Sequence, residues 1–166
     1  LLKEIDSISH VERIRFHTRF QIGIPERITL DLVNNLKQIS KAIWWVLHVN
    51  HPLEIDSEVE ASIKFLKSAG VSVLSQTVFL KGVNDSEETL EALLVKLSNS
   101  GVQPYYLHQL DQVEGTNHFE ALPEKGIEIL ENLSNRLSGF MIPRFVKEVP
   151  HKSKKTPLHS LNRLNT

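Results

Sequence analysis

The sequence predicts an α/β protein built on a parallel sheet. Apolar segments of strand length alternate with amphipathic segments of helix length, and the pair recurs about every 30 residues, the length of a βαβ unit. Glycines are placed to end several of the helical segments, at Gly70, Gly101 and Gly139. Five strand segments are too few to close an eight-stranded barrel. We therefore expect an open sheet or part of a (β/α) barrel, with right-handed crossovers.

The first strand and helix lie within residues 11–39. Apolar side chains in residues 1–8 share one helical face with no cap before them, so the chain is expected to begin inside a helix. Residues 11–17 (VERIRFH) form the first strand and residues 22–27 a loop. Thr29 is then placed to cap the next helix.

The second strand is predicted at residues 43–49 (IWWVLHV). Its nearly continuous apolar character is typical of a parallel strand covered on both faces, with Trp44 and Trp45 in the core. Ser57 and Glu60 then have the spacing of a capping box, which predicts the start of a helix.

The third strand, residues 71–80, contains an amide that must find a partner if it is buried. Gln76 interrupts the apolar run, and its partner is a side chain, a backbone group or a ligand. Asp85 and Ser86 are both good N-caps, and Glu88 stands three residues after Asp85, as in a capping box. A helix is therefore predicted after this strand.

The last two strands are predicted at residues 102–108 and 140–146. Tyr105 and Tyr106, inside the fourth strand, are interpreted as packing residues. Pro123 is placed to open the helix between these strands, with Leu137 on its inward face.

Composition excludes several classes of protein. The 166 residues are 40% hydrophobic, enough for one ordinary core, and the formal charge of −1 gives no overall attraction to nucleic acid or an anionic membrane. No apolar run reaches the roughly 20 residues of a membrane span, so we expect a cytoplasmic protein that binds neither nucleic acid nor membrane. The absence of cysteine excludes disulfides, zinc–thiolate sites and thiolate-held iron–sulfur clusters within this chain.

Hydrogen-bonding side chains recur at or near the C-terminal end of every predicted strand. They are His17 and Arg19, His48 and Asn50, Gln76, His108 and Asp111, and Arg144 and Glu148. Ligands bind at this edge in parallel α/β proteins, although each residue alone is also compatible with a core, capping or turn role. Asp111 and Glu148 could jointly bind a ligand ammonium. No metal site is predicted.

A basic tail, residues 151–157 (HKSKKTP), follows the last strand. It is either a solvated run of charge or the source of a lysine nucleophile that forms a Schiff base with a carbonyl cofactor. Spacing alone does not decide between these interpretations.

Several motifs, in order along nearly the whole chain, resemble the C-terminal half of the lysine 2,3-aminomutase family. They are residues 16–19 (FHTR), 49–52 (VNHP), 76–85 (QTVFLKGVND), 104–111 (PYYLHQLD) and 115–119 (GTNHF). The sequences of residues 108–111 (HQLD) and 155–158 (KTPL) are most similar to the branch that makes (R)-β-lysine for translation elongation factor P. These are radical S-adenosylmethionine enzymes that also use pyridoxal phosphate and a [4Fe-4S] cluster.

The resemblance implies a role for five residues. Lys155 would be the Schiff-base lysine for pyridoxal phosphate, and Gln76 and His48 would lie against S-adenosylmethionine. Asp111 and Glu148 would bind the side-chain ammonium of the substrate, free lysine. The implied reaction is a radical 1,2-amino shift that converts (S)-α-lysine to (R)-β-lysine. We expect Gln76, Asp111 and Lys155 to converge on one pocket.

The resemblance also implies a division of the chain and a missing part. Residues 1–148 would be the C-terminal half of a radical SAM partial barrel, and residues 149–166 the segment that carries the cofactor lysine. The CxxxCxxC cluster loop and the first strands are missing, so the chain alone should be inactive and its first strand an unpaired edge. The complete enzyme is expected to be a homo-oligomer. Lys154 competes with Lys155, because the glycine-rich approach found in many members is replaced here.

Three interpretations of function therefore stand. The chain is a fragment or truncated form of a lysine 2,3-aminomutase-like isomerase, a degenerate non-catalytic remnant, or a pyridoxal-phosphate-binding half that needs a separate cluster-bearing chain.

Overall fold

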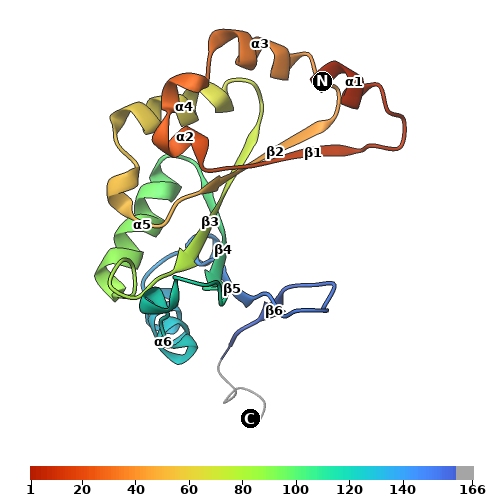
Figure 1. The fold of residues 1–166 in the computed structure, drawn as a ribbon. Helices are drawn as coiled ribbons and strands as arrows, with labels where there is room; N and C mark the ends of the chain where they lie inside the picture. The colour runs from red at the N-terminus through yellow and green to blue at the C-terminus, as the bar shows by residue number, and fades with distance from the viewer. Residues whose placement is uncertain (160–166) are drawn as a thin grey trace.

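The fold is a curved, mainly parallel sheet with helices along one side (Figure 1). The computed structural model describes residues 1–159. Its sheet has the spatial order β1-β2-β3-β4-β5-β6, with parallel pairing through β5 and an antiparallel final strand. The strands are β1 (Arg13–Thr18), β2 (Ala42–His48), β3 (Ser72–Phe79), β4 (Gln103–Gln109), β5 (Arg144–Lys147) and β6 (Thr156–Pro157). The predicted α/β partial barrel with five parallel strands is confirmed.

Each pair of neighbouring parallel strands is joined by a crossover that contains helix. The α-helices are α1 (Leu2–Asp6), α2 (Phe20–Gly23), α3 (Leu30–Lys37), α4 (Ser57–Lys67), α5 (Glu87–Asn99) and α6 (Pro123–Ser134). Short 3-10 turns are η1 (Pro25–Arg27), η2 (Pro52–Glu54), η3 (Asn117–Phe119) and η4 (Gly139–Met141). In Figure 1, α2, α4 and α5 lie to the left of β3 and β4, with α3 above them and α6 below. The sheet thus has a helix-covered face and an inner face.

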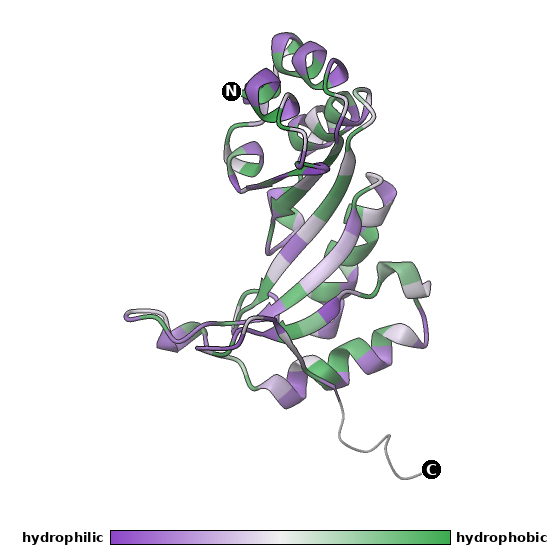
Figure 2. Cartoon of the chain, turned by 90° about the vertical axis from the view of Figure 1, so that its right-hand side faces the viewer, coloured by the Kyte–Doolittle hydropathy of each residue, from purple (hydrophilic) through white to green (hydrophobic). Residues whose placement is uncertain are grey.

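Burial on the helix-covered face holds the fold together. Alternate strand residues such as Leu47, Phe79 and Leu107 have no exposed surface and pack in two apolar clusters with the helices. Gly126 in α6 allows that helix to approach closely, because a Cβ there would lie 2.7 Å from the Phe145 ring. In Figure 2 the helices show alternating hydrophobic and hydrophilic bands, as expected when only one side of each faces the sheet.

The structure corrects one predicted helix cap and selects between two candidates for another. Asp56 caps α4 by accepting hydrogen bonds from the backbone N–H groups of Glu58 and Val59, so the predicted Ser57–Glu60 capping box is wrong. Ser86 caps α5, because Asp85 accepts a hydrogen bond from the Gly82 N–H and pairs with Lys125. Thr29 caps α3 as predicted.

Other boundaries also differ from the predictions. Part of the predicted loop at 22–27 is helical, in α2 and η1. Helix α6 ends at Ser134, so Leu137 packs from beyond the helix and Gly139 opens η4 instead of ending α6. The fifth strand is consequently short and begins only at Arg144. Strand β6 was not predicted, because its pairing with β5 depends on a long-range return of the basic tail.

A bilayer-crossing helix is absent from residues 1–159, since each helix there is too short or too polar.

Candidate functional site

The inner face of the sheet carries rows of polar and aromatic side chains. In one row, His48, Gln76, Tyr106 and Arg144 are register partners on four adjacent strands. Register partners in a sheet present their side chains on the same face, so these four residues lie side by side. The predicted pair of His48 and Gln76 is therefore adjacent.

A second row lies one pleat further along the strands. It contains Val78, His108 and Val146, which are register partners on β3, β4 and β5. His108 also contacts its inner-face neighbour Tyr106, with ring centroids 5.5 Å apart in an edge-on arrangement. The two rows together form a continuous surface of mixed polar and apolar character.

A bulge in β4 brings both tyrosines to this surface. The register shifts at Ser75/Gln76, so Tyr105 is left without a partner, and the Tyr105 and Tyr106 rings lie 3.9 Å apart. The pKa of Tyr105 is raised, first by its hydrogen bond with Tyr106 and then by burial. Both tyrosines are half-buried, so they line the inner face and are not enclosed by a core.

The prediction that Trp44 lies in the core is wrong. Trp45 is buried at 7% exposure, but Trp44 is 37% exposed on the opposite side of the same strand. Trp44, Leu74 and Tyr105 help to line a hollow of about 370 Å³ together with arginines of β1. The second strand is therefore covered by helices on one face only.

Lys155 projects from the chain just before β6 toward the inner face. Its ammonium group pairs with the carboxylate of Glu148 and lies 5.6 Å from the centroid of the Tyr106 ring. The hydrogen bond from Lys155 is the main reason that the pKa of Glu148 is lowered. Lys154 and Lys155 both line a hollow of about 230 Å³ in the turn before β6.

Histidines on the inner face favour the neutral form. His108 is 6% exposed, and burial, followed by the charge of Lys155, lowers its pKa to about 4. The pKa values of His17 and His48 are also lowered, chiefly by burial. The Nε2 atoms of His48 and His108 are buried without a hydrogen-bond partner, which is costly unless a ligand supplies one.

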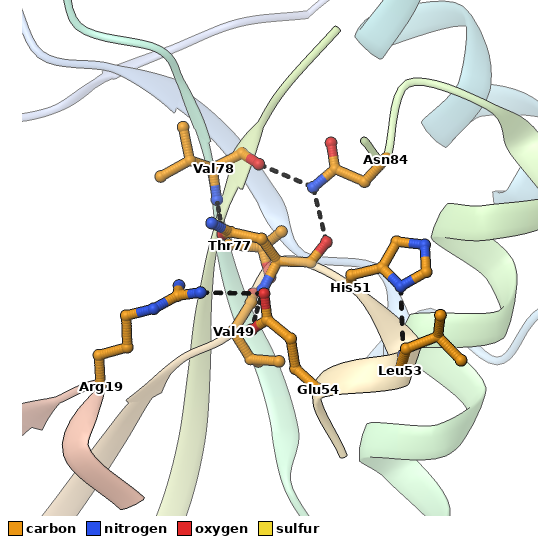
Figure 3. A network of polar contacts seen from close by, with 9 residues as sticks. Arg19, Val49, His51, Leu53, Glu54, Thr77, Val78 and Asn84 are labelled. Carbon is orange, nitrogen blue, oxygen red and sulfur yellow. Dashed lines mark hydrogen bonds and ion pairs between the residues drawn. The ribbon is translucent and has the colours of Figure 1, made fainter. Parts of the chain in front are cut away.

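A polar network fixes the C-terminal ends of β2 and β3 (Figure 3). The Asn84 side chain, fully buried, donates to the carbonyls of Asn50 and Val78 and accepts from the Leu80 N–H. The Asn50 side chain accepts from the Val78 N–H, and the Thr77 hydroxyl donates to the Val49 carbonyl. Asn50 therefore acts as a structural strand-end residue in this network.

Arg19 has a local partner at the same edge. Its guanidinium pairs with the Glu54 carboxylate at 3.0 Å, while Glu54 also accepts from the Asn50 N–H (Figure 3). These contacts tie the end of β1 to the turn after β2.

The other predicted site residues lie in two places, one near Lys155 and one in the row that contains Tyr106. Asp111 is exposed and lines a hollow of about 630 Å³ together with Lys147 and Glu148. Glu148 thus pairs with Lys155 and shares a hollow with Asp111, whereas Gln76 lies in the row with Tyr106. Arg144 is at the amino end of β5, so its predicted place at the carboxyl end is wrong.

The comparisons with known proteins give one consistent result. No family model matches the chain. L-lysine 2,3-aminomutase from Methanococcus maripaludis is 42% identical over 158 residues, and that from Escherichia coli is 38% identical over 158 residues. Both matches cover 95% of this chain. Nearly the whole of this chain is therefore similar in sequence to L-lysine 2,3-aminomutases.

This chain spans less than half the length of the aminomutases it matches. It covers 36% of the M. maripaludis protein and 46% of the E. coli protein. A crystal structure of Streptococcus suis SuiB bound to S-adenosylmethionine shares the fold, with a TM-score of 0.55 at 14% identity. That match covers 82% of this chain and 33% of the SuiB chain. The fold and the sequence family thus agree with the predicted resemblance.

Sequence reasoning missed two features of the inner face. Tyr106 was interpreted as packing, yet it lies beside Lys155, and the signal for its position was the bulge opposite Ser75. Trp44 was interpreted as core, although a polar residue, Arg15, is its register partner on the edge strand. A run of apolar letters does not distinguish a strand with one covered face from a strand with two.

Proposed function

We propose that this chain is part of an isomerase that converts (S)-α-lysine to (R)-β-lysine by a radical 1,2-amino shift. The observation that carries the proposal is the placement of Lys155, Glu148, Tyr106 and His108 together on the inner face of an aminomutase-family sheet. The product, the substrate and the cofactors are inferred from the residues and the family.

Lys155 is our candidate to hold pyridoxal phosphate, in the segment 149–166. When bound, this cofactor supplies an electrophilic carbonyl carbon and an electron-withdrawing ring. The residues fit such a group, because an amine, an aromatic face and a buried unpartnered imidazole nitrogen lie together. Lys152, Ser153 and Lys154 line the adjacent hollow, where the two lysines would neutralise a phosphate and the Ser153 hydroxyl would donate a hydrogen bond to it.

Glu148 would hold the Lys155 amine away from a carbonyl carbon. The Glu148 carboxylate accepts a hydrogen bond from the Lys155 side chain, so the amine nitrogen is engaged in the ion pair. We infer that the pair must open before Lys155 reacts. Glu148, together with Asp111 across their shared hollow, would then be free to bind the side-chain ammonium of a lysine substrate.

His48 and Gln76 are our candidates for S-adenosylmethionine. They are adjacent in register on β2 and β3, and the unpartnered, buried Nε2 of His48 needs a polar neighbour. When bound, this cofactor supplies the radical source. The [4Fe-4S] cluster does not fit this chain, because the sequence has no cysteine to hold it.

Borohydride trapping tests the cofactor lysine. The chain is incubated with pyridoxal phosphate, reduced with sodium borohydride and digested, and mass spectrometry locates the pyridoxyl group. We expect modification at Lys155, loss of it in Lys155→Ala and retention in Lys154→Ala. Modification that survives Lys155→Ala but not Lys154→Ala would show that Lys154, and not Lys155, holds the cofactor. Absence of specific trapping in the unsubstituted chain would favour a non-catalytic remnant.

A second candidate function is a pyridoxal-phosphate-binding half that works with a separate cluster-bearing chain. It is favoured by the absence of cysteine from these 166 residues, which leaves the cluster ligands to residues outside them. Mixing the chain with a cysteine-bearing N-terminal segment of an aminomutase tests it. β-Lysine formed only by the mixture, with added cofactors and reductant, would support this function, and no product from a stable complex would oppose it.

A further inference from the structure

His108 is a buried histidine whose ring nitrogen has no partner. It is in the C-terminal part of β4, with Val78 and Val146 as its register partners on either side. Only 6% of its surface is exposed, and its Nε2 makes no hydrogen bond. A polar atom buried in this way is explained when a bound group completes its hydrogen bonding.

The surroundings of His108 form one side of the Lys155 site. The ring of Tyr106 contacts the imidazole and also lies under the Lys155 ammonium. The charged or titratable groups that face His108 are Lys155, Glu148 and His48, from the turn before β6, the end of β5 and β2. Its flanking register partners are both valine.

The charge state of His108 limits the kind of atom it recognises. With a pKa of about 4 the imidazole is neutral at pH 7, so it offers one donor and one acceptor and no positive charge. A phosphate gains more from the ammonium groups of Lys152 and Lys154 in the neighbouring turn. A neutral imidazole between two valines can hydrogen-bond a polar atom of an aromatic ring while the valines contact the apolar part of that ring.

We propose that His108 is a cofactor-binding residue whose Nε2 hydrogen-bonds a polar atom of the pyridine ring held at Lys155. This inference rests on the proposed function, because it needs pyridoxal phosphate to bind at Lys155. It assigns the contact to the ring and not to the phosphate.

The test compares dissociation constants from absorbance titrations of pyridoxal phosphate and of pyridoxal, which lacks the phosphate. His108→Phe should weaken both ligands about tenfold, the equivalent of losing one good hydrogen bond. His108→Asn, which keeps a donor and an acceptor, should recover part of the loss. His118→Phe, a change of an exposed histidine in η3, is the matched control and should change neither constant.

Each outcome separates the two proposals. Equal binding by His108→Phe and the unsubstituted chain would overturn this inference alone, as would weaker binding of pyridoxal phosphate with unchanged binding of pyridoxal. Failure of the unsubstituted chain to bind either ligand at Lys155 would overturn the proposed function and this inference with it.

A measurement on the unsubstituted chain guards against misfolding of the variants. The imidazole ¹⁵N resonances of His108 should shift when pyridoxal phosphate is added, because Nε2 gains a partner. Resonances that stay unchanged while Lys155 is modified would overturn the inference.

Discussion

The two faces of the sheet differ in the burial and polarity of their side chains. On the helix-covered face, side chains such as Leu47, Phe79 and Leu107 are fully buried among other apolar groups. On the inner face, buried histidine nitrogens remain unpartnered, and tyrosines and a tryptophan stay partly exposed. The difference teaches that one face supplies most of the apolar burial, whereas the other presents histidine, glutamine and tyrosine side chains at a surface without covering helices.

Truncation of Phe79 should give the largest effect on stability. Phe79 has no exposed surface and meets the Phe145 ring at 5.8 Å, so Phe79→Ala leaves a cavity that α6 cannot fill. We expect a loss of about 3–5 kcal/mol in the free energy of unfolding, measured by urea denaturation. Tyr106→Ala on the inner face should cost clearly less. Equal losses would remove the distinction between the faces.

Acidification should reveal the buried histidine. The pKa of His108 is lowered to about 4, so the unfolded chain binds a proton more readily than the folded chain does. Stability is full above the ordinary histidine pKa of about 6.5 and falls as pH drops from there to about 4, by roughly 3 kcal/mol in total. Urea denaturation between pH 7 and 4 measures this slope. The slope should flatten in His108→Phe, and an unchanged slope would contradict the assignment.

Removal of the Asn84 side chain should loosen the strand ends. Asn84→Ala leaves the Leu80 N–H and two carbonyls without partners in a buried position, which we expect to cost roughly 2–3 kcal/mol. Asn35→Ala is the matched control, because its amide bonds only to the Asp31 carbonyl on an exposed helix. That variant should change unfolding by less than about 0.5 kcal/mol. The reverse order of the two losses would show that the network is not needed.

Neutralising Glu148 should have the smallest effect on stability and a clear effect on reactivity. The Glu148 carboxylate is exposed, so Glu148→Gln should leave the unfolding free energy within about 0.5 kcal/mol. Because Lys155 then lacks its carboxylate partner, we expect faster borohydride-trapped modification at neutral pH. Glu120→Gln, a change of an exposed carboxylate after η3, is the control. Slower modification in Glu148→Gln would mean that Glu148 activates Lys155.

The sequence was a good guide wherever local patterns decide the structure. The helix predicted after the third strand is present as α5, and its apolar residues Leu90, Leu93, Leu94 and Leu97 are buried. The alternation of strands and helices likewise predicted the parallel sheet. These features depend on residues close together in the chain.

The errors arose where the outcome depends on distant partners. Trp44 and Trp45 are consecutive and identical, and only the position of the helices decides which one is buried. Asp56, and not the predicted Ser57, is the N-cap of α4, because neighbouring side chains compete for the same backbone N–H groups at the start of a helix. The pairing of β6 with β5, which positions Lys155, was not predicted because it joins the basic tail to a strand distant from it in the chain. The short length of β5 was not predicted either.

The site was predicted in part for the same reasons. His48 and Gln76 were both expected near the C-terminal ends of their strands, and the structure shows them in register on β2 and β3. The roles of Lys155, Asp111 and Glu148 came from the family likeness and stay predictions. The family likeness did not predict that Glu148 and Lys155 form an ion pair with each other.

The most direct test of a ligand-binding inner face is a map of backbone amide chemical shifts on addition of pyridoxal phosphate. The account predicts changes centred on Tyr106, His108 and Lys155, with α4 and α5 on the covered face unchanged. Changes confined to the helices, or to the basic turn at Lys152 and Lys154 without Tyr106 and His108, would contradict it.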